Sequence, residues 1–212
     1  MTEVGARVLL GELTDGLDHL LPAFEGLAGA LPGDVMWPLS TALAHGLAGR
    51  TDQAGATLAG VTTSDLRALP RSTLWLTHVS GLSQLAWLCR RPDLATIVLE
   101  LLEPLRGTHV VVAGLAYRGA VRHWQGLALH TAGRLDDAEG ALRDALLQHQ
   151  AVGSPPWTAQ TELALAVTLA ERGGADSACA GIGLLDSAAA TAERRGMTML
   201  LRRCAAARSL AP

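Results

Sequence analysis

The chain has 212 residues and contains no lysine and no asparagine. A phosphate-binding loop that ends in Lys-Ser or Lys-Thr is therefore excluded, as are enzymes that hold a substrate or pyridoxal phosphate through a lysine Schiff base. Isoleucine occurs only as Ile97 and Ile182, and aromatic residues make up only 3% of the chain. We attribute this bias to a GC-rich genome.

Hydrophobic residues make up 49% of the chain and charged residues only 17%. Because aromatic residues are scarce, most of the apolar content is alanine and leucine, which are good helix formers. The length is sufficient for one domain or one short array of repeats with a sizeable core. The net charge of −3 and the pI near 6.1 provide no general attraction to nucleic acid. We expect an all-α protein that does not bind nucleic acid directly.

The three cysteines, Cys89, Cys179 and Cys204, lie far apart and form no Cys-x-x-Cys pair. This pattern is typical of reduced thiols in a cytoplasmic protein. No signal peptide is visible at the N-terminus. The one long uncharged stretch, 72–89, contains too many hydroxyl and amide groups to insert favourably into a membrane. We therefore expect a cytoplasmic protein without a membrane span.

The segment 119–150 has the pattern of two antiparallel helices. Two stretches with apolar residues three or four positions apart flank Gly133, which can take the left-handed conformation that ends a helix. Asp136 and Asp137 follow, where they match the positive end of the second helix dipole. Gly126 stands where a side chain must be small for the helices to approach closely. Together with Ala138 and Ala145, these small residues resemble the tetratricopeptide signature.

Similar helical hairpins recur along the chain at intervals of about 35 to 45 residues. We predict one domain over residues 1–212, a tetratricopeptide-like, right-handed helical solenoid. Within the hairpin at 72–104, Arg90 stands in place of the turn glycine. Residues 106–113 are rich in β-branched side chains, but a lone strand would have no partner, so we expect an extended connector there. The predicted hairpins are 2–30, 34–60, 72–104, 114–150 and 157–195, followed by a capping helix at 197–210.

Four stretches, LPRSTLWL at 69–76, LLEPLRGTHVVVAG at 101–114, HTAGRLDDAEGALRDAL at 130–146 and SPPWTAQTELALAVTLAERGG at 154–174, carry a wider resemblance. They resemble the C-terminal tetratricopeptide region of actinobacterial multidomain ATPase regulators of the LuxR-type or cyclase-linked kind. The chain itself departs from those proteins because it has no lysine for an ATPase phosphate loop. The resemblance implies a regulatory module, either cut from such a regulator or descended from one.

In tetratricopeptide geometry, the concave groove is lined by the first helix of each hairpin. The mixture of polar and aromatic groups at those positions suits a peptide, a protein partner or a small neutral effector. The sequence fits equally well a tight superhelix in which these side chains pack against neighbouring helices. The candidate groove residues are Met36, Thr77, Ser80, Gln84, Trp87, His123, His130, Gln160 and Glu171.

A catalytic or metal-binding function has little support in the sequence. His123 and His130 lie two helical turns apart, about 10.5 Å along the axis, which is too far for joint metal binding. Ser154 lies in a proline-rich turn without the glycines of a nucleophile elbow. We therefore expect no enzyme activity, no cofactor and no metal. The leading hypothesis is a module that binds a protein or peptide in the groove, and the alternative is a sensor of small effectors in the same groove.

Overall fold

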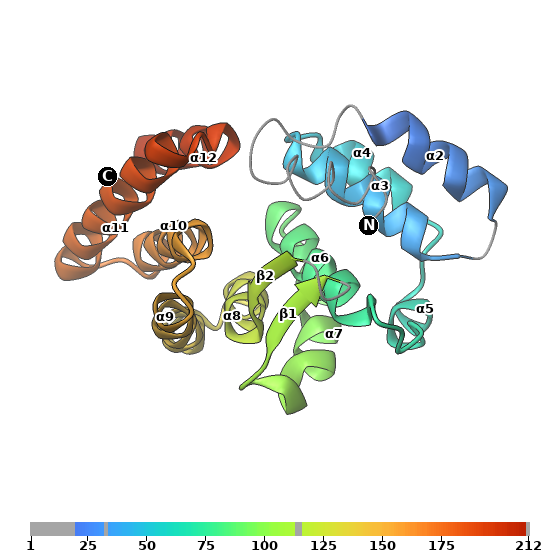
Figure 1. Cartoon of the computed structure of the whole chain (residues 1–212), viewed down its shortest axis with the longest axis horizontal. Coiled ribbons are helices and arrows are strands. Elements are labelled where there is room, and N and C mark those ends of the chain that lie inside the picture. Colours follow the sequence, from blue (N-terminus) through green and yellow to red (C-terminus); the bar gives the residue numbers. More distant parts are fainter. Residues whose placement is uncertain (1–19, 32–33, 113–115, 211–212) are drawn as a thin grey trace.

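The computed structural model describes residues 20–31, 34–112 and 116–210, and these residues are mostly helical, as predicted. Figure 1 shows the helices along an arc that begins with α2 and ends with α11 and α12. The predicted helix at 2–13 lies outside the described residues. The elements are α2 (Leu21–Ala30), α3 (Met36–Leu47), α4 (Thr51–Thr57), α5 (Thr63–Arg67), α6 (Trp75–Leu88), α7 (Pro92–Leu102), η2 (Glu103–Leu105), β1 (His109–Val112), β2 (Ala116–Ala120), α8 (Val121–Thr131), α9 (Leu135–Ala151), α10 (Pro155–Arg172), α11 (Ala175–Arg195) and α12 (Thr198–Leu210).

The central helical hairpin is formed as the sequence predicts. Gly133 has φ +75° in the turn between α8 and α9, which a residue with a Cβ adopts only at a cost. The two helices lie close together at Gly126, where an added Cβ would lie 2.6 Å from two side-chain atoms of Leu142. Asp136 and Asp137 occupy the first turn of α9. The small residue at 126 therefore sets the distance between α8 and α9.

The same helix end recurs along the chain. A backbone N–H donates to the carbonyl five residues earlier after α3, α6 and α8, in the bonds from Arg50 to His45, from Arg91 to Ala86 and from Arg134 to Leu129, each 2.9 Å long. This bond belongs to the motif that closes a helix with one left-handed residue. Gly49 supplies that residue after α3, with φ +77°, but after α6 it is Arg90, with φ +51°. The missing glycine of that hairpin thus leaves the turn geometry unchanged.

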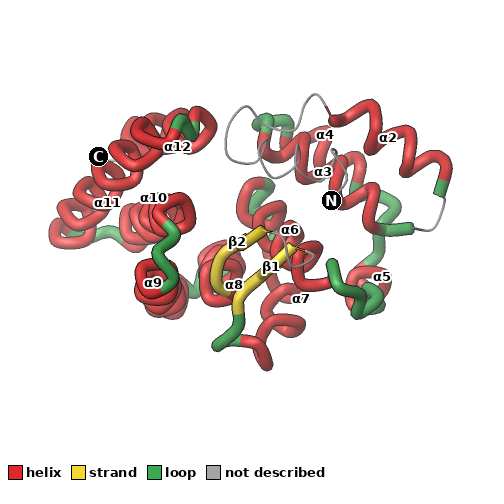
Figure 2. Tube along the Cα trace, viewed as in Figure 1, coloured by secondary structure: helices red, strands yellow, loops and turns green. Residues whose placement is uncertain are grey.

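The expectation of an extended connector at 106–113 is wrong. His109–Val112 forms β1 and pairs with β2 in an antiparallel hairpin whose register is interrupted between His109 and Val111. The partner strand was overlooked because Ala-Tyr-Arg-Gly-Ala contains one aromatic residue and no β-branched one. Figure 2 shows the two strands beside α8 and α6. Within β2, Gly119 has φ +87°, and an added Cβ would lie 2.8 Å from the ring of Trp157.

One large buried cluster runs from α3 to α10 and includes Trp75, Trp124 and Trp157. A second cluster joins α10, α11 and α12 around Leu163, Leu185 and other residues. Burial of these apolar stripes, which recur at helical spacing, supplies the main force that holds the helices together. None of the helices in the described ranges is both long and apolar enough to cross a membrane.

Candidate functional site

Two of the predicted groove residues, Ser80 and Gln84, are buried, so the prediction that they line an open groove is wrong. The cause is Arg118 of β2, which is itself only 2% exposed. Its Nε donates to the Ser80 hydroxyl at 3.0 Å, and its Nη2 lies 3.5 Å from the Gln84 amide oxygen. The arginine side chain of the unpredicted strand therefore covers this face of α6, so no open groove remains there.

His123 is only 3% exposed, and its prediction as a groove residue is wrong for a similar reason. Its Nδ1 lies 2.9 Å from the Thr161 hydroxyl, which in turn lies 3.0 Å from Nδ1 of His149. The other nitrogen of His149 accepts the backbone N–H of Ala120 at 2.8 Å. Neutral His149 must therefore carry its proton on Nδ1 and donate to Thr161. This buried network joins α8, α9, α10 and β2.

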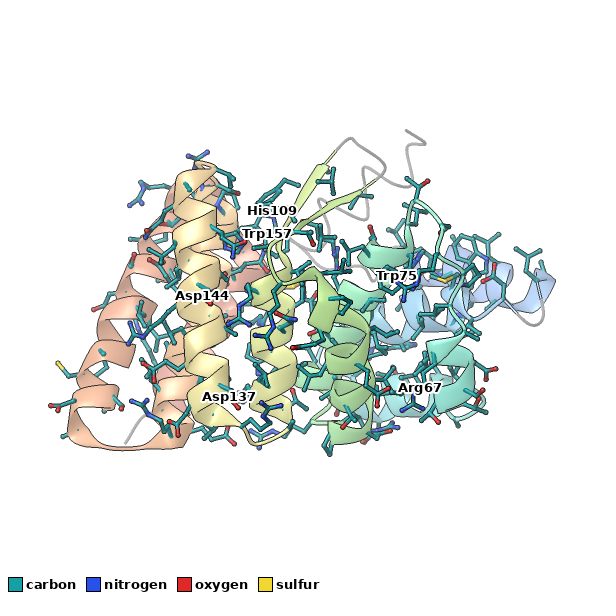
Figure 3. All side chains as sticks on the ribbon, turned by 90° about the horizontal axis from the view of Figure 1, so that it is seen from below. Arg67, Trp75, His109, Asp137, Asp144 and Trp157 are labelled. Atoms are coloured by element: carbon teal, nitrogen blue, oxygen red, sulfur yellow. The ribbon has the colours of Figure 1, made fainter. Side chains whose placement is uncertain are left out.

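Trp157, whose ring centre lies 5.7 Å from that of His123, is labelled together with His109 near the β hairpin in Figure 3. The Trp157 indole N–H donates to the Tyr117 carbonyl at 2.9 Å, so the hairpin is held onto α10. Burial lowers the pKa of His149 to about 4, and it holds the pKa of His123 well below the usual value. Both imidazoles are therefore neutral near pH 7 and serve as structural groups.

Met36, Thr77 and Gln160 do not share a site with the other predicted residues. Met36 lines a separate cavity near the start of α3, together with Asp34, His78 and other residues. The Thr77 hydroxyl is buried and has no hydrogen-bond partner among the residues that the structure describes. Gln160 is half-buried on α10. The predicted groove is thus divided: Met36 borders a cavity of about 730 Å³ that no other predicted groove residue lines, and another part of the groove is open elsewhere.

That open part brings together Trp87, His130 and Glu171, three of the predicted residues. They line a pocket of about 510 Å³, a size typical of sites for small ligands. We call it the Trp87 pocket. Four helices or their ends contribute to it. Its lining also includes Leu88 and Arg90 at the end of α6, Thr131 at the end of α8, Leu163 and Val167 of α10, and Arg203, Ala206 and Ala207 of α12.

Trp87 is in contact with two of the polar groups of the pocket. The guanidinium of Arg203 lies 4.7 Å from the centre of the indole ring, within the range of a cation–π interaction. The His130 ring meets the indole edge-on, with 6.2 Å between the ring centres. Trp87 therefore forms a rigid aromatic wall between α8 and α12.

His130 is held by hydrogen bonds on both sides. Its Nε2 lies 3.1 Å from a carboxylate oxygen of Glu171, and its Nδ1 lies 3.1 Å from the Thr168 hydroxyl. Burial lowers the pKa of His130, the Glu171 carboxylate opposes that shift, and Arg90 adds to it. In the neutral imidazole, Nε2–H can donate to Glu171, and Nδ1 then faces the Thr168 hydroxyl, which also donates to the Ala164 carbonyl at 2.9 Å.

The polar groups that line the pocket are fixed by hydrogen bonds. The hydroxyl of Thr131 donates to the Leu127 carbonyl at 2.8 Å. No group of three His, Cys, Asp or Glu side chains in the described ranges could hold a metal ion. The pocket offers instead an aromatic wall, apolar side chains and several fixed polar groups.

Arg203 is not among the groove residues predicted from the sequence. The structure shows that Arg203 is half-buried, whereas Arg202 is exposed. The spacing of Arg203 from apolar residues of the same helix indicates this burial. Arg203 follows the buried residues Met199 and Leu200 by four and three positions, so it shares the inward face of α12 with them.

Comparisons of this chain with protein-family models, with curated proteins and with solved structures find no match.

Proposed function

We propose that this chain is a non-catalytic regulatory binding module, in which the Trp87 pocket holds an effector. The observation that carries the proposal is that α6, α8, α10 and α12, which are distant in sequence, meet around one open pocket. A ligand that contacts all four would favour one arrangement of the helices over others. Such differential contact is what a ligand needs in order to shift a conformational equilibrium.

We further propose that the helical hairpins form a tetratricopeptide-like, right-handed solenoid related to the repeat regions of actinobacterial regulators. The recurring helix ends and the small residue at the α8–α9 contact support this assignment. In such a module the first helix of each hairpin faces the concave side, and α6, α8 and α10 are those helices. An effector in the Trp87 pocket would then report to an attached or associated domain in the cytoplasm.

The size of the pocket favours a small effector over an extended peptide. A peptide that follows the groove would need an open path past Ser80, Gln84 and His123, and all three are buried. A pocket of about 510 Å³ instead lies within the size range of sites for small molecules. This reverses the order of the two hypotheses that the sequence supports, since the sequence favoured a protein or peptide in the groove.

A protein partner remains the second candidate, and a different surface favours it. Leu147 of α9 is 66% exposed, and Val152, just after that helix, is 50% exposed. Large apolar side chains that are exposed on a surface can belong to interaction sites, although single ones are common. This surface lies on the α9 side of the molecule and not in the Trp87 pocket.

The experiment is a fragment screen by NMR on protein with labelled leucine and valine methyl groups. We expect fragments of mixed chemistry to shift the methyl signals of Leu88, Leu163 and Val167, which line the pocket. The signals of Leu147 and Val152 serve as internal controls, because these residues are exposed elsewhere. If no fragment shifts the pocket signals, or if Leu147 and Val152 respond instead, the proposed effector site is wrong.

A further inference from the structure

The charges of the Trp87 pocket are unbalanced. Two guanidinium groups, those of Arg90 and Arg203, belong to its lining, together with one carboxylate, that of Glu171. The carboxylate is already engaged by His130 at 3.1 Å. Within the ranges that the structure describes, neither arginine forms an ion pair with a carboxylate, whereas Arg67, Arg91, Arg122 and Arg134 all do. The pocket thus carries excess positive charge.

Arg203 is also half-buried, so its guanidinium is partly removed from water. The protein around it lowers the pKa of its guanidinium to about 10, because removal from water disfavours the charged form. Among the residues that the structure describes, the Cys204 thiol is the one group that raises this pKa, and no acidic side chain does so. The contact with the Trp87 ring offsets part of this cost. A half-buried guanidinium without a carboxylate partner is a good donor for an anion that enters from solvent.

The remaining residues that line the Trp87 pocket are apolar, and they determine which kind of ligand body fits. Leu163 and Val167 of α10 face the pocket together with Ala206 and Ala207 of α12. These side chains cannot satisfy the hydrogen bonds of a strongly polar ligand, which would remain unpaired at a cost. A matching ligand therefore needs an anionic head and an apolar body.

We propose that the Trp87 pocket binds a small organic monocarboxylate, whose carboxylate is held by Arg203 and Arg90 and whose apolar body lies against Trp87, Leu163 and Val167. This inference rests on the proposed function and deepens it by naming the chemical class of the effector. It replaces the neutral effector that the sequence suggested, because sequence reasoning did not place Arg203 in the site. A planar guanidinium can form two parallel hydrogen bonds with a carboxylate, which distinguishes it from a neutral amide.

The test compares acids with their own primary amides. Phenylacetate, indoleacetate, octanoate and decanoate are titrated into the full chain by calorimetry, and each amide is titrated in parallel. The amide keeps the size and the apolar body and removes the charge. We expect at least one acid to bind about tenfold or more tightly than its amide, as expected when a charge-assisted hydrogen bond is lost.

Substitutions at two neighbouring residues test whether the preference for the acid over its amide arises in the Trp87 pocket. Arg203→Gln removes the guanidinium of the pocket, whereas Arg202→Gln removes the same charge from an exposed position on the same helix. We expect Arg203→Gln to abolish the preference for the acid and Arg202→Gln to leave it within about twofold. Arg203→Lys should restore part of the preference, since lysine keeps the charge without the planar fork. Thermal unfolding without ligand verifies that each variant is folded.

The outcomes separate this inference from the proposed function. If acids and amides bind equally well and both shift the methyl signals of Leu163 and Val167, the site is real but the anion inference is overturned. Equal losses in Arg203→Gln and Arg202→Gln would also overturn it, because the acid would then bind elsewhere. If none of the acids binds, the carboxylate class is excluded, and the fragment screen alone decides whether the pocket is an effector site.

Discussion

His123 and His130 of α8 pair with Thr161 and Thr168 of α10 in the same way, one heptad apart. The distances from Nδ1 to the threonine oxygen are 2.9 Å and 3.1 Å, and each pair spans 38 residues. Each threonine hydroxyl also lies 2.9 Å from the carbonyl four residues earlier. The two pairs fix the register of α8 against α10, and only the second borders the Trp87 pocket.

The first prediction separates the two histidines. His123→Ala should cost about 2–4 kcal/mol of unfolding free energy, because it leaves a cavity and breaks a buried network. His130→Ala should cost less, about 1–2 kcal/mol, because it lies at the edge of an open pocket. Urea denaturation measures both. A cost below about 0.5 kcal/mol for His123→Ala is typical of an exposed residue and would contradict its burial.

The second prediction concerns the α8–α9 contact. Gly126→Ala should destabilise the protein by about 1–3 kcal/mol, since the new Cβ would lie 2.6 Å from atoms of Leu142. Gly140→Ala on α9 is the matched control. Nothing lies within 4 Å of its added Cβ, so it should stabilise the helix by about 0.5–1 kcal/mol. Equal effects of the two substitutions on the melting temperature would refute the close approach at Gly126.

The third prediction concerns the left-handed turn after α6. Arg90→Gly should raise stability by about 0.5–1 kcal/mol, because φ +51° is costly for a residue with a Cβ and natural for glycine. The gain is limited because glycine adds entropy to the unfolded chain. The reverse change, Gly133→Arg, should cost about 1–2 kcal/mol in the equivalent turn. A loss of stability in Arg90→Gly would mean that its side-chain contacts outweigh the backbone strain.

The fourth prediction is a loss of stability in acid. The pKa values of His78 and His149 are lowered to about 4 by burial, and that of His123 is held lower than usual. In the unfolded chain these groups take up protons below about pH 6.5, whereas the folded chain resists them. Stability is therefore full above about pH 6.5 and falls between that pH and about 4.

For each of the three histidines, the unfolding free energy should fall by up to about 1.4 kcal/mol for each pH unit of acidification in that window. Urea denaturation at a series of pH values measures the total slope. His149→Gln cannot titrate there, so its slope should be shallower by about that amount. An unchanged slope in this variant would show that His149 is not a buried neutral group.

The helical hairpins could be predicted from the sequence because their signals are local. Glycine at 133, acidic residues at 136 and 137 and a small residue at 126 each act within one turn or one helix pair. Arg90 shows the limit of such signals, since an arginine can hold the left-handed position when the surrounding hairpin determines it.

The candidate site could be predicted only in part, because it depends on contacts between distant segments. Trp87, His130 and Glu171, three of the groove residues predicted from the sequence, line one pocket in the structure. The closure of the groove over Ser80 and Gln84 depends on Arg118, which is carried by a strand with little β propensity of its own. The role of Arg203 depends on how α12 folds back toward Trp87, which no local pattern specifies.

The most direct test of the Trp87 pocket as the effector site is to fill it. Ala206 lines the pocket, and its neighbour Ala205 is exposed on the same helix outside the lining. Ligands identified in the fragment screen are titrated by calorimetry against Ala206→Trp and Ala205→Trp. The account predicts that Ala206→Trp weakens binding by about tenfold or more, which is about 1.4 kcal/mol, while Ala205→Trp changes it by less than about twofold. Equal affinity of the two variants for every ligand would contradict the account.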